Sequence, residues 1–487
     1  MDQKVFNYLL EIGCCKACGL RYLSSKDIDF SDVDGYIKKR NLINNDVPEK
    51  SDDLCVKKCK LNPCTVCLGL LQEPVIDDII NKVLLSEVQK YDSTVFNCSI
   101  STPTAILMRE YAIGLMLLSN FPDLYENMQT FSLSKTWKLI VKNRLVEKLN
   151  MKFENSSTCN FWIDVIMDYE DNNKEAQVVS KLASNKKNKL LSSRKYISDL
   201  LSSIPPEEYK DVATFPPEIP DKFLYCKLVT CRHNSVYLAG RYCKFSRELS
   251  QSSWIIDGKK AKETSVEEII FEQINKLFSI PTSQLKFSAS GREDCDVRCL
   301  GKGRPFYIEI SDPKKTVFTF NEFRELEVKI NESSLIKVRD LQDVERSELA
   351  KIKEGEQMKS KDYVALCITK QPVTQEQMDK IDNAGSLVLK QKTPIRVLHR
   401  RPLAVRDKKI EEMKAHLIPG KDNMFILHVV TGAGTYIKEF IHGDFGRTKP
   451  SIGTIIDDEV DIIALDVVAV NLDWPKEIDV KTSQVES

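Results

Sequence analysis

The chain has 487 residues, enough for roughly two or three domains, and 42% of them are apolar, which suffices for real hydrophobic cores. Its 71 basic and 71 acidic side chains cancel, which excludes a uniformly basic coat protein but not local charged patches. The N-terminus lacks the pattern of a secretory signal. The most apolar stretch, residues 112–118, is shorter than the roughly 18 residues that span a bilayer. We therefore expect a soluble intracellular protein.

The first 67 residues form a cysteine-rich module with seven of the fifteen cysteines: Cys14, Cys15, Cys18, Cys55, Cys59, Cys64 and Cys67. Four of them form two C-x-x-C pairs, a spacing that lets two thiolates reach one ion. Two such pairs complete the tetrahedral sulfur shell that zinc prefers, so we predict one structural zinc held by Cys15, Cys18, Cys64 and Cys67. The alternative is reduced structural cysteines, and the three extra cysteines leave the choice of ligands open. A redox role is disfavoured because no thioredoxin-like βαβ unit surrounds the pairs.

The segment from about 70 to 165 has helical texture, with apolar residues at helical spacing over 75–91. A polar stretch at 168–195 predicts a mobile or partly helical segment. Residues 202–223 contain five prolines and predict the main linker between domains. We therefore place an accessory domain at 1–215 and a second domain at 216–480.

The second domain is dominated by short strand-like runs, interrupted by helical text at 266–278 and 320–330. The runs occupy residues 224–231, 304–311, 363–369, 386–391, 425–431 and 462–474. This order lacks the regular β–α–β alternation of a parallel sheet. It predicts an α+β fold with a mixed, mostly antiparallel sheet.

Two segments of this domain combine positive charge with aromatic or apolar residues. Residues 391–410 carry seven Lys or Arg against one acid, Asp407. Residues 237–263 mix basic residues with aromatic ones such as Trp254. Cations neutralise phosphates and aromatic faces stack on bases, so the two segments favour an RNA or DNA partner over a merely solvated surface.

The loop GREDCDVR at 291–298 places two arginines and three acids around one cysteine. Such a loop can be a solvated cluster of ion pairs. It can also hold one carboxylate ionised in a partly dry place, with the other charges supporting it. The remaining motifs of the domain favour the second interpretation.

The Gly-Arg-x-Asp pattern of this loop resembles the catalytic loop of pseudouridine synthases. KDYVAL at 361–366 and AGTYIKEFIHGDFGRTKPSIG at 433–453 resemble their later motifs. Together with the basic segments and the cysteine pairs, they point to the archaeal and eukaryotic tRNA pseudouridine synthase family numbered ten. The resemblance covers nearly all of 216–475, and the N-terminal region through its cysteines.

The resemblance implies a role for each matching residue. Asp294 matches the catalytic nucleophile, and Asp296 is its rival by spacing alone. Substrate-binding residues would be Tyr363, Tyr436, Lys438 and Arg292, with Lys438 as the cation beside the aspartate. Residues 254–267 match the family's forefinger loop and 393–408 its thumb loop. The RNA-binding candidates on these two loops are Trp254, Lys259, Lys260, Lys262, Arg396, His399, Arg400, Arg401 and Arg406. Cys295 and Cys299 replace the expected small or apolar residues and should act as apolar fillers.

The family further implies a pseudouridine synthase core and an accessory domain with a THUMP-like RNA-binding part. It implies tRNA as partner, modification at positions fifty-four and fifty-five of the T-arm, and a location in the cytoplasm or nucleus, with mitochondria left open. The isomerisation needs no catalytic cofactor, and we expect a monomer. Two alternatives remain. One is a non-catalytic RNA-binding or RNA-processing scaffold. The other is a metal-dependent nuclease that pairs Asp294 or Asp296 with Glu309.

Overall fold

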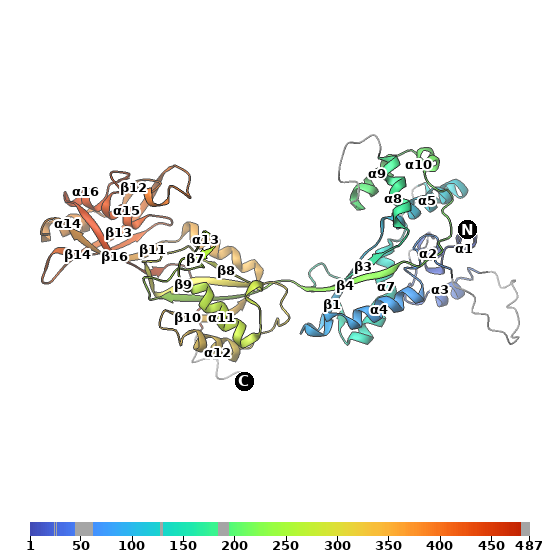
Figure 1. The fold of residues 1–487 in the computed structure, drawn as a ribbon, viewed down its shortest axis with the longest axis horizontal. Coiled ribbons are helices and arrows are strands. Elements are labelled where there is room, and N and C mark those ends of the chain that lie inside the picture. The colour runs from blue at the N-terminus through green and yellow to red at the C-terminus, as the bar shows by residue number, and fades with distance from the viewer. Residues whose placement is uncertain (24, 26, 44–61, 127–129, 184–193, 479–487) are drawn as a thin grey trace. The chain divides into compact units, whose positions relative to one another are not determined.

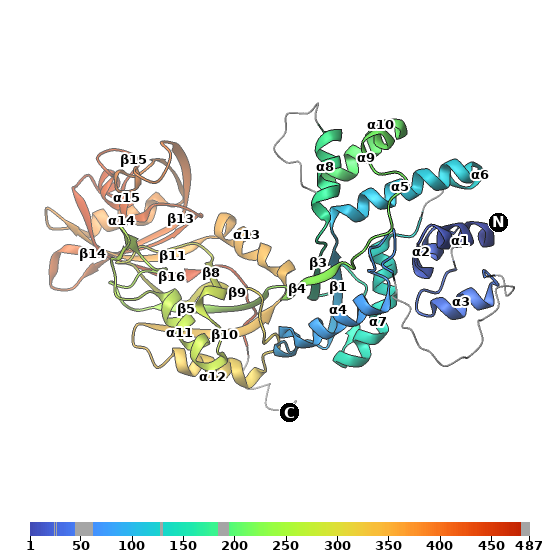
Figure 2. The ribbon, with the colours of Figure 1, turned by 45° about the vertical axis from the view of Figure 1, so that its right-hand side comes forward.

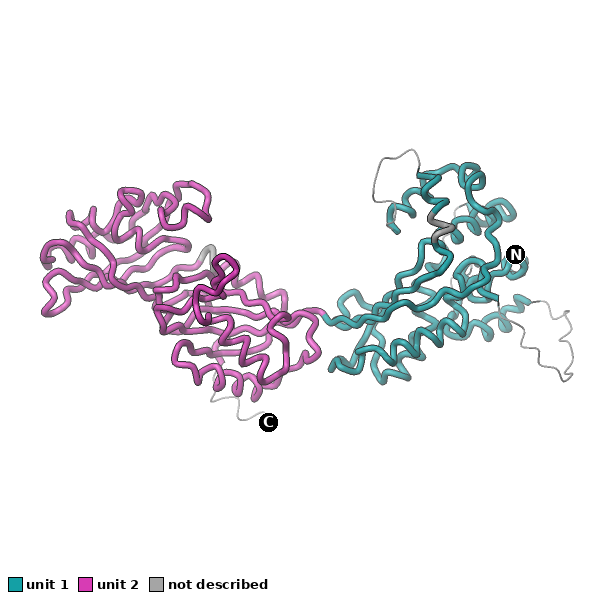
Figure 3. The backbone as a smooth tube through the Cα atoms, in the orientation of Figure 1, with its two compact units in different colours: residues 1–233 teal, residues 234–487 magenta. Residues whose placement is uncertain are grey.

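The computed structural model describes all residues except 24, 26, 44–61, 127–129, 184–193 and 479–487 (Figure 1). Cys55 and Cys59 lie outside the described residues. The chain divides into two compact units, residues 1–233 and 234–487 (Figure 3). This division falls after β4 (Tyr225–His233), whereas composition placed the domain boundary at 215/216. Residues 225–233 belong to the first unit because β4 pairs with β3 (Phe161–Asp168).

The first unit is mainly helical around one small sheet. The sheet has the order β2-β1-β3-β4, with β1 (Val95–Ser101) parallel to β2 (Lys152–Phe153) and to β3, and β4 antiparallel to β3. Its helices are α1 (Asp2–Glu11), α2 (Lys16–Arg21), α3 (Val33–Lys39), α4 (Glu73–Leu85), α5 (Thr104–Asn120), α6 (Pro122–Tyr125), α7 (Leu133–Leu149), α8 (Asn172–Leu182), α9 (Arg194–Ser203) and α10 (Pro206–Val212).

A single large core joins this sheet to α1, α2, α4, α5 and α7. Alternate residues of β3 point into the core, as the period of two in a half-buried strand requires. The cysteines at the N-terminus are part of the same core. In the described part of the chain, no helix combines the length and apolar character needed to cross a bilayer.

The proline-rich segment 202–223 differs from the linker that its composition predicts. It contains α10, whose Tyr209 is buried and donates a hydrogen bond to the backbone oxygen of Met108, 2.9 Å away. Pro206 lies in the first turn of that helix, where a missing N–H costs nothing. The prolines therefore start a helix and shape a packed segment.

The second unit is built on one ten-stranded sheet (Figure 2). The strand order is β10-β5-β9-β16-β11-β14-β13-β12-β15, with β8 also paired to β9. These strands are β5 (Val236–Lys244), β8 (Leu285–Ala289), β9 (Arg298–Ile310), β10 (Ile336–Val344), β11 (Lys361–Thr369), β12 (Leu387–Lys392), β13 (Val405–Ile418), β14 (Lys421–Thr431), β15 (Thr448–Lys449) and β16 (Val460–Val470).

The sheet has two halves with separate cores. Helices α11 (Val266–Phe278) and α12 (Phe320–Ile330) cover the half that contains β5, β8, β9 and β10. The helices of the other half are α14 (Gln375–Ala384), α15 (Ile437–His442) and α16 (Ile452–Ile456). A further helix, α13 (Ala350–Met358), and a separate hairpin of β6 (Ile255–Ile256) and β7 (Lys259–Lys260) complete the unit.

The two halves join where β9 runs parallel to β16 over a short register, Arg298 opposite Asp466 and Cys299 opposite Val467. All other strand pairs of this sheet are antiparallel. The predicted α+β class with a mixed, mostly antiparallel sheet is therefore confirmed. The loop 291–297 lies between β8 and β9, directly before this junction.

Candidate active site and metal centre

The GREDCDVR loop is anchored to both halves of the sheet. Its backbone turns at Gly291, where φ is +83°, a conformation that side chains rarely adopt. At its far end, Arg298 pairs with Asp466 of β16 through an Nε–Oδ1 contact of 2.9 Å. Arg247 reaches the same carboxylate at 2.6 Å. The loop is therefore held at the boundary between the two cores.

The three acids of the loop have three different surroundings. Glu293 is buried and accepts hydrogen bonds from Arg304 Nε at 2.7 Å and from the hydroxyl of Tyr242 at 2.9 Å. Gln251 in turn donates to that hydroxyl at 2.8 Å. A buried carboxylate that is paired and hydrogen-bonded in this way is a structural support. Because Glu293 has this structural role, Asp294 and Asp296 remain as the candidates for the catalytic carboxylate.

A buried lysine, Lys244, holds the backbone of the same loop. The ammonium of Lys244 donates to the backbone oxygens of Leu249, Asp294 and Cys295 at 2.8, 3.2 and 2.8 Å. Burial lowers the pKa of Lys244, an effect that the nearby charge of Glu293 only partly offsets. Lys244 thus fixes the backbone that carries Asp294.

Asp294 is about one-third exposed, with 34% of its side-chain surface accessible, and it faces two cations. Nη1 of Arg396 lies 2.9 Å from its Oδ2, and Nζ of Lys438 lies 3.5 Å from the same oxygen. An anion in this place is both accessible and electrostatically supported.

Asp296 differs in exposure and in partner. It is 64% exposed, and Lys438 lies closer to it, at 2.7 Å, than to Asp294. Partial burial acts against its charge, but the hydrogen bond and attraction from Lys438 prevail and lower the pKa of Asp296. Lys438 therefore bridges both aspartates, which matches its expected place beside the catalytic carboxylate and adds a second partner.

Arg396 has a different environment from the other basic residues of the thumb loop. Its Nε donates to the buried carboxylate of Glu439 at 2.6 Å, and its guanidinium lies 5.8 Å from the ring centroid of Tyr436. Tyr436 precedes α15, and its backbone is held by the side chain of the buried Gln391: Nε2 of Gln391 donates to the Tyr436 backbone oxygen at 2.9 Å, and the Tyr436 N–H donates to Oε1 of Gln391 at 3.0 Å. Arg396 thus contacts both the ring of Tyr436 and the carboxylate of Asp294.

Tyr363 lies on β11, between Val429 of β14 and Val467 of β16. Burial raises the pKa of its phenol to about 12, and the charge of Arg304 only moderates this effect. The neutral phenol is therefore the form present at neutral pH. This environment moves the pKa away from the range that a general base needs.

The remaining predicted contacts lie on the surface. Arg292 is exposed, and no salt bridge among the described residues includes it. Trp254, Lys259 and Lys260 belong to the exposed β6–β7 hairpin and its base, with Lys262 just after it, and Lys260 pairs with Glu268. His399, Arg400, Arg401 and Arg406 are exposed along the thumb loop and the start of β13.

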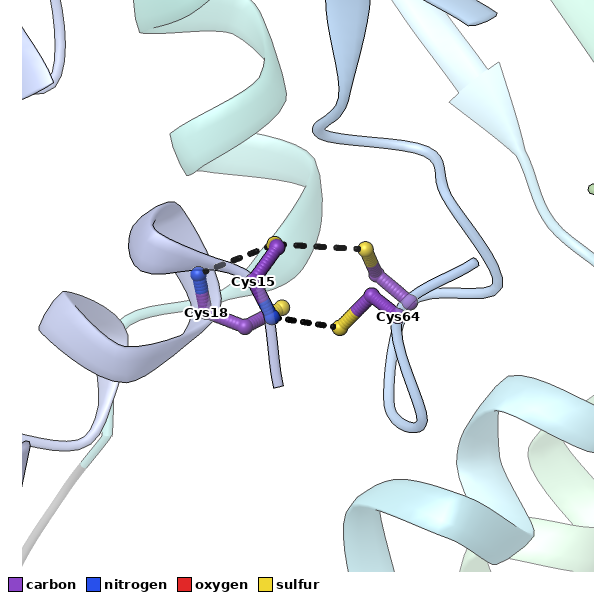
Figure 4. Close-up of side chains that lie close together, drawn as sticks. Cys15, Cys18 and Cys64 are labelled. Carbon is purple, nitrogen blue, oxygen red and sulfur yellow. Dashed lines mark hydrogen bonds between the residues drawn. The ribbon is translucent and has the colours of Figure 1, made fainter. Parts of the chain in front are cut away.

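The four predicted zinc ligands come together in the first unit. Cys15 begins α2 and Cys18 lies in its first turn, while Cys64 and Cys67 lie in a turn whose Thr65 N–H donates to Gly13. Their sulfur atoms all lie within 4.8 Å of one another. Figure 4 shows how Cys15, Cys18 and Cys64 converge. Zn–S bonds of about 2.3 Å in a tetrahedron place sulfurs about 3.8 Å apart. The Cys15–Cys67 separation of 3.9 Å fits this geometry.

The surroundings of these sulfurs also suit a metal. Backbone N–H groups of Cys15 and Cys18 point at Cys64 and Cys15 sulfurs at 3.2 and 3.5 Å. Burial opposes a charge on Cys64, yet hydrogen bonds from the neighbouring thiols lower the pKa of Cys64 well below the ordinary value. Without an ion, hydrogen bonds to neighbouring thiols raise the pKa of Cys15, and burial raises that of Cys18, well above it. Arg21, itself buried, donates to Cys18 sulfur at 3.7 Å. The group can therefore hold a metal ion such as zinc.

Two family models match this chain. One described as Pus10, C-terminal, matches residues 237–471, and one described as Eukaryotic Pus10, N-terminal, matches residues 64–231. A Xenopus laevis protein named tRNA pseudouridine synthase Pus10 is 34% identical over 518 residues, covering 98% of each chain. The chain belongs to the Pus10 family.

Other relatives agree with this assignment. A Homo sapiens protein of the same name is 38% identical over 435 residues, covering 87% of this chain and 81% of its own. A Thermofilum pendens Pus10 is 40% identical over 239 residues, 48% of this chain. A crystal structure of a Cbf5-Nop10-Gar1 complex covers 47% of both chains at 16% identity, but its TM-score of 0.25 is too low to support any conclusion. Membership of the Pus10 family confirms the predicted family and makes the chain a pseudouridine synthase, hence an isomerase.

Several functional residues of this Pus10 chain were not singled out from the sequence. Glu293, Arg304 and Glu439 are buried charged residues whose partners lie 11 or more positions away along the chain. A charged residue in the middle of a strand, such as Arg304 in β9, is the one signal that could have drawn attention to them. Lys244 belongs to the basic segment 237–263 that was expected to face RNA, and this expectation is wrong for Lys244 because its side chain is buried and donates to backbone oxygens.

Proposed function

We propose that this chain converts uridine to pseudouridine in tRNA and that Asp294 is the catalytic carboxylate. The observation that carries the proposal is the contrast among the three acids of one loop. Glu293 is buried and paired with Arg304, and most of the side chain of Asp296 is exposed to solvent. Asp294 alone of the three is partly exposed with two cations within 3.5 Å.

The reaction can be performed by such a carboxylate. The bond between C1′ and N1 breaks, the base turns, and a bond between C1′ and C5 forms, while C5 loses a proton and N1 gains one. No electron or atom is exchanged with a cosubstrate. Asp294 attacks the sugar or the ring, or assists removal of the 2′-proton, and each route needs its ionised form. Arg396 and Lys438 support that form.

The target base must leave its stack to reach Asp294, and the site offers aromatic faces to receive it. Tyr436 lies at the N-terminal end of α15, against Arg396. Tyr363 presents a neutral phenol from the neighbouring β11. We assign both tyrosines to substrate contact.

The surface loops extend this site toward the rest of the RNA. The β6–β7 hairpin exposes Trp254, Lys259 and Lys260, and residues 398–406 of the thumb loop expose one histidine and three arginines. Cations and aromatic groups of this kind bind phosphates and stack on bases. Family resemblance supports the T-arm, positions fifty-four and fifty-five, as the substrate region.

For the first unit we propose a structural zinc at Cys15, Cys18, Cys64 and Cys67 and a THUMP-like role in RNA binding. The zinc supplies a cross-link between α2 and the turn at 64–68. Three of its four ligands are buried and Cys15 is half-buried, so the ion would have a structural role and take no part in the chemistry at Asp294.

The nuclease alternative lacks support. Glu309 pairs with Tyr237 of β5, whereas Cys299, next to the loop, pairs with Lys244, seven residues or about 23 Å along that strand, and Glu309 accepts a hydrogen bond from Ser235 instead. Incubating the protein with unmodified tRNA and EDTA separates the alternatives. Pseudouridine formation that persists supports the synthase, loss of RNA cleavage by chelation supports a nuclease, and binding without turnover supports a scaffold.

A further inference from the structure

Arg396, near the start of the thumb loop, contacts two carboxylates at once. Its guanidinium bridges two carboxylates: Nε and Nη2 face Glu439 at 2.6 and 3.4 Å, and Nη1 faces Asp294 at 2.9 Å. A planar guanidinium with five donors can serve two carboxylates at once, which a lysine ammonium cannot do with the same geometry.

Glu439 explains why Arg396 stays there. Its side chain is only 2% exposed, and Arg396 is the cation that accompanies it in the described part of the chain. A buried carboxylate without a cation is strongly destabilising. Glu439 therefore holds the guanidinium within reach of Asp294, although Arg396 itself is 37% exposed.

The backbone around Arg396 is fixed to the same motif that carries Glu439. The N–H of Ile395 donates to Asp444 Oδ2 at 3.3 Å, and Arg447 donates to the backbone oxygen of Thr393 at 2.5 Å. Arg400 and Arg401 contrast with this arrangement. Both are exposed, and none of the salt bridges found among the described residues includes them.

We propose that Arg396 is a positioning residue for Asp294, held in place by Glu439, and not primarily a contact to RNA phosphate. The proposal rests on the proposed function, in which Asp294 is the catalytic carboxylate. It divides the basic thumb loop into two parts with different tasks. The first part, at Arg396, orients and supports the reacting carboxylate. The second part, at Arg400 and Arg401, grips RNA.

Lys438 does not replace Arg396 in this role. Its ammonium lies 2.7 Å from Asp296 but 3.5 Å from Asp294, so its shorter contact is with the more exposed aspartate. Arg396 is thus the nearer cation of Asp294. Without Arg396, the one remaining cation contact of Asp294 among the described residues is the 3.5 Å contact with Lys438.

The test uses the full-length protein. It compares Arg396→Gln, Arg396→Lys, Glu439→Gln and the double variant of Arg396→Gln with Glu439→Gln against Arg401→Gln. Two quantities are measured for each variant with an unmodified tRNA transcript. The first is the single-turnover rate of pseudouridine formation at saturating protein. The second is the dissociation constant as a function of salt. Asp294→Asn is run beside them.

We expect Arg396→Gln to lower the single-turnover rate about tenfold or more, the loss expected for a partly exposed charge-assisted contact to a reacting group. Its dissociation constant and salt slope should stay close to those of the parent. Glu439→Gln should lower the same rate, and the double variant should be no slower than Arg396→Gln alone, because the two residues act as one unit. Arg396→Lys keeps a cation beside Glu439 and should recover only part of the rate. Arg401→Gln should weaken binding and flatten the salt slope.

Two results would overturn the proposal. One is an Arg396→Gln variant that turns over at the parental rate. The other is an Arg396→Gln variant that behaves as Arg401→Gln does, with weaker tRNA binding, a flatter salt slope and an unchanged rate at saturating protein. An active Asp294→Asn variant would instead overturn the proposed function, so the two failures can be told apart.

Discussion

Burial decides what each charge of the GREDCDVR loop does. Glu293 and Arg304 form an ion pair in which neither side chain is more than 2% exposed, and this pair supports the loop from inside. Arg298 ties the loop to β16 through Asp466. Asp294 is left accessible beside two cations. A loop that could have been a solvated ion-pair cluster is therefore a supported carboxylate.

The first prediction concerns the inner pair. Glu293→Gln leaves Arg304 as a buried cation without its carboxylate, so the second unit should lose roughly 3 kcal/mol or more of unfolding free energy. Chemical denaturation followed by tryptophan fluorescence and circular dichroism would measure this loss. The matched control is Glu477→Gln, which breaks an exposed pair with Arg339 and should change little. Equal stability of the two variants would contradict the structural role of Glu293.

Local sequence patterns could suggest candidate site residues but not the buried residues that support them. Asp294, Tyr363, Tyr436 and Lys438 lie in contiguous motifs, so each could be named from its local pattern. Arg396 and Glu439 are separated by 43 positions, and Arg304 reaches back 11 positions to Glu293. Which distant charges meet is set by strand order and packing, which local patterns do not encode. For the same reason Arg396 could be grouped only with its basic neighbours.

At the scale of elements, two helices begin and end where their sequence texture predicts, and capping residues explain why they begin there. Ser265 caps α11 by accepting from the N–H of Glu268, and Thr319 with Glu322 forms a capping box at α12. The apolar spacing behind these caps gave the expected ranges 266–278 and 320–330. The structure of segment 202–223 was harder to predict, because a proline can end a helix or occupy the first turn of one. Only the packing of Tyr209 shows that this segment contains a helix and is not an open linker.

The second prediction concerns the outer thumb loop. Arg400→Gln and Arg401→Gln should each weaken tRNA binding and lower the slope of log K against log salt by about 0.9 or less, the share of one phosphate contact. Binding isotherms over a range of salt concentrations measure this slope. Asp407, an exposed acid of the same region, offers the control Asp407→Asn, which should not flatten it. Unchanged slopes in both arginine variants would mean that these residues only face solvent.

The third prediction concerns the cysteine turn. Purified protein should carry about one equivalent of zinc, and Cys64→Ser should lose it together with part of the stability of the first unit. Metal analysis and thermal unfolding measure both effects. Cys226→Ser is the control, because Cys226 is equally buried on β4 but lies outside the four-sulfur group. Protein prepared with zinc and found free of metal would refute the assignment.

At the scale of the molecule, the two units have separate hydrophobic cores. The buried residues of the first unit's clusters lie within 5–226, and those of the second unit's clusters lie within 238–474. Units with their own cores can unfold separately. The GREDCDVR loop lies wholly in the second unit and the cysteine group wholly in the first. The proposed metal site and the proposed catalytic carboxylate thus belong to different units.

The fourth prediction follows from this separation. Calorimetry should show two unfolding transitions, and a strong zinc chelator should lower the temperature of only one of them. Cys64→Ser should lower the same transition, whereas Glu293→Gln should lower the other. A single transition that moves as a whole in all three experiments would contradict independent units.

The measurement that bears most directly on the account is pseudouridine formation by Asp294→Asn and Asp296→Asn on one unmodified tRNA. Asparagine keeps the size of the side chain and removes its charge and nucleophilic oxygen. We expect Asp294→Asn to bind tRNA and form no detectable pseudouridine, while Asp296→Asn retains measurable turnover. The reverse pattern would assign catalysis to Asp296, and activity in both variants would contradict a catalytic carboxylate in this loop.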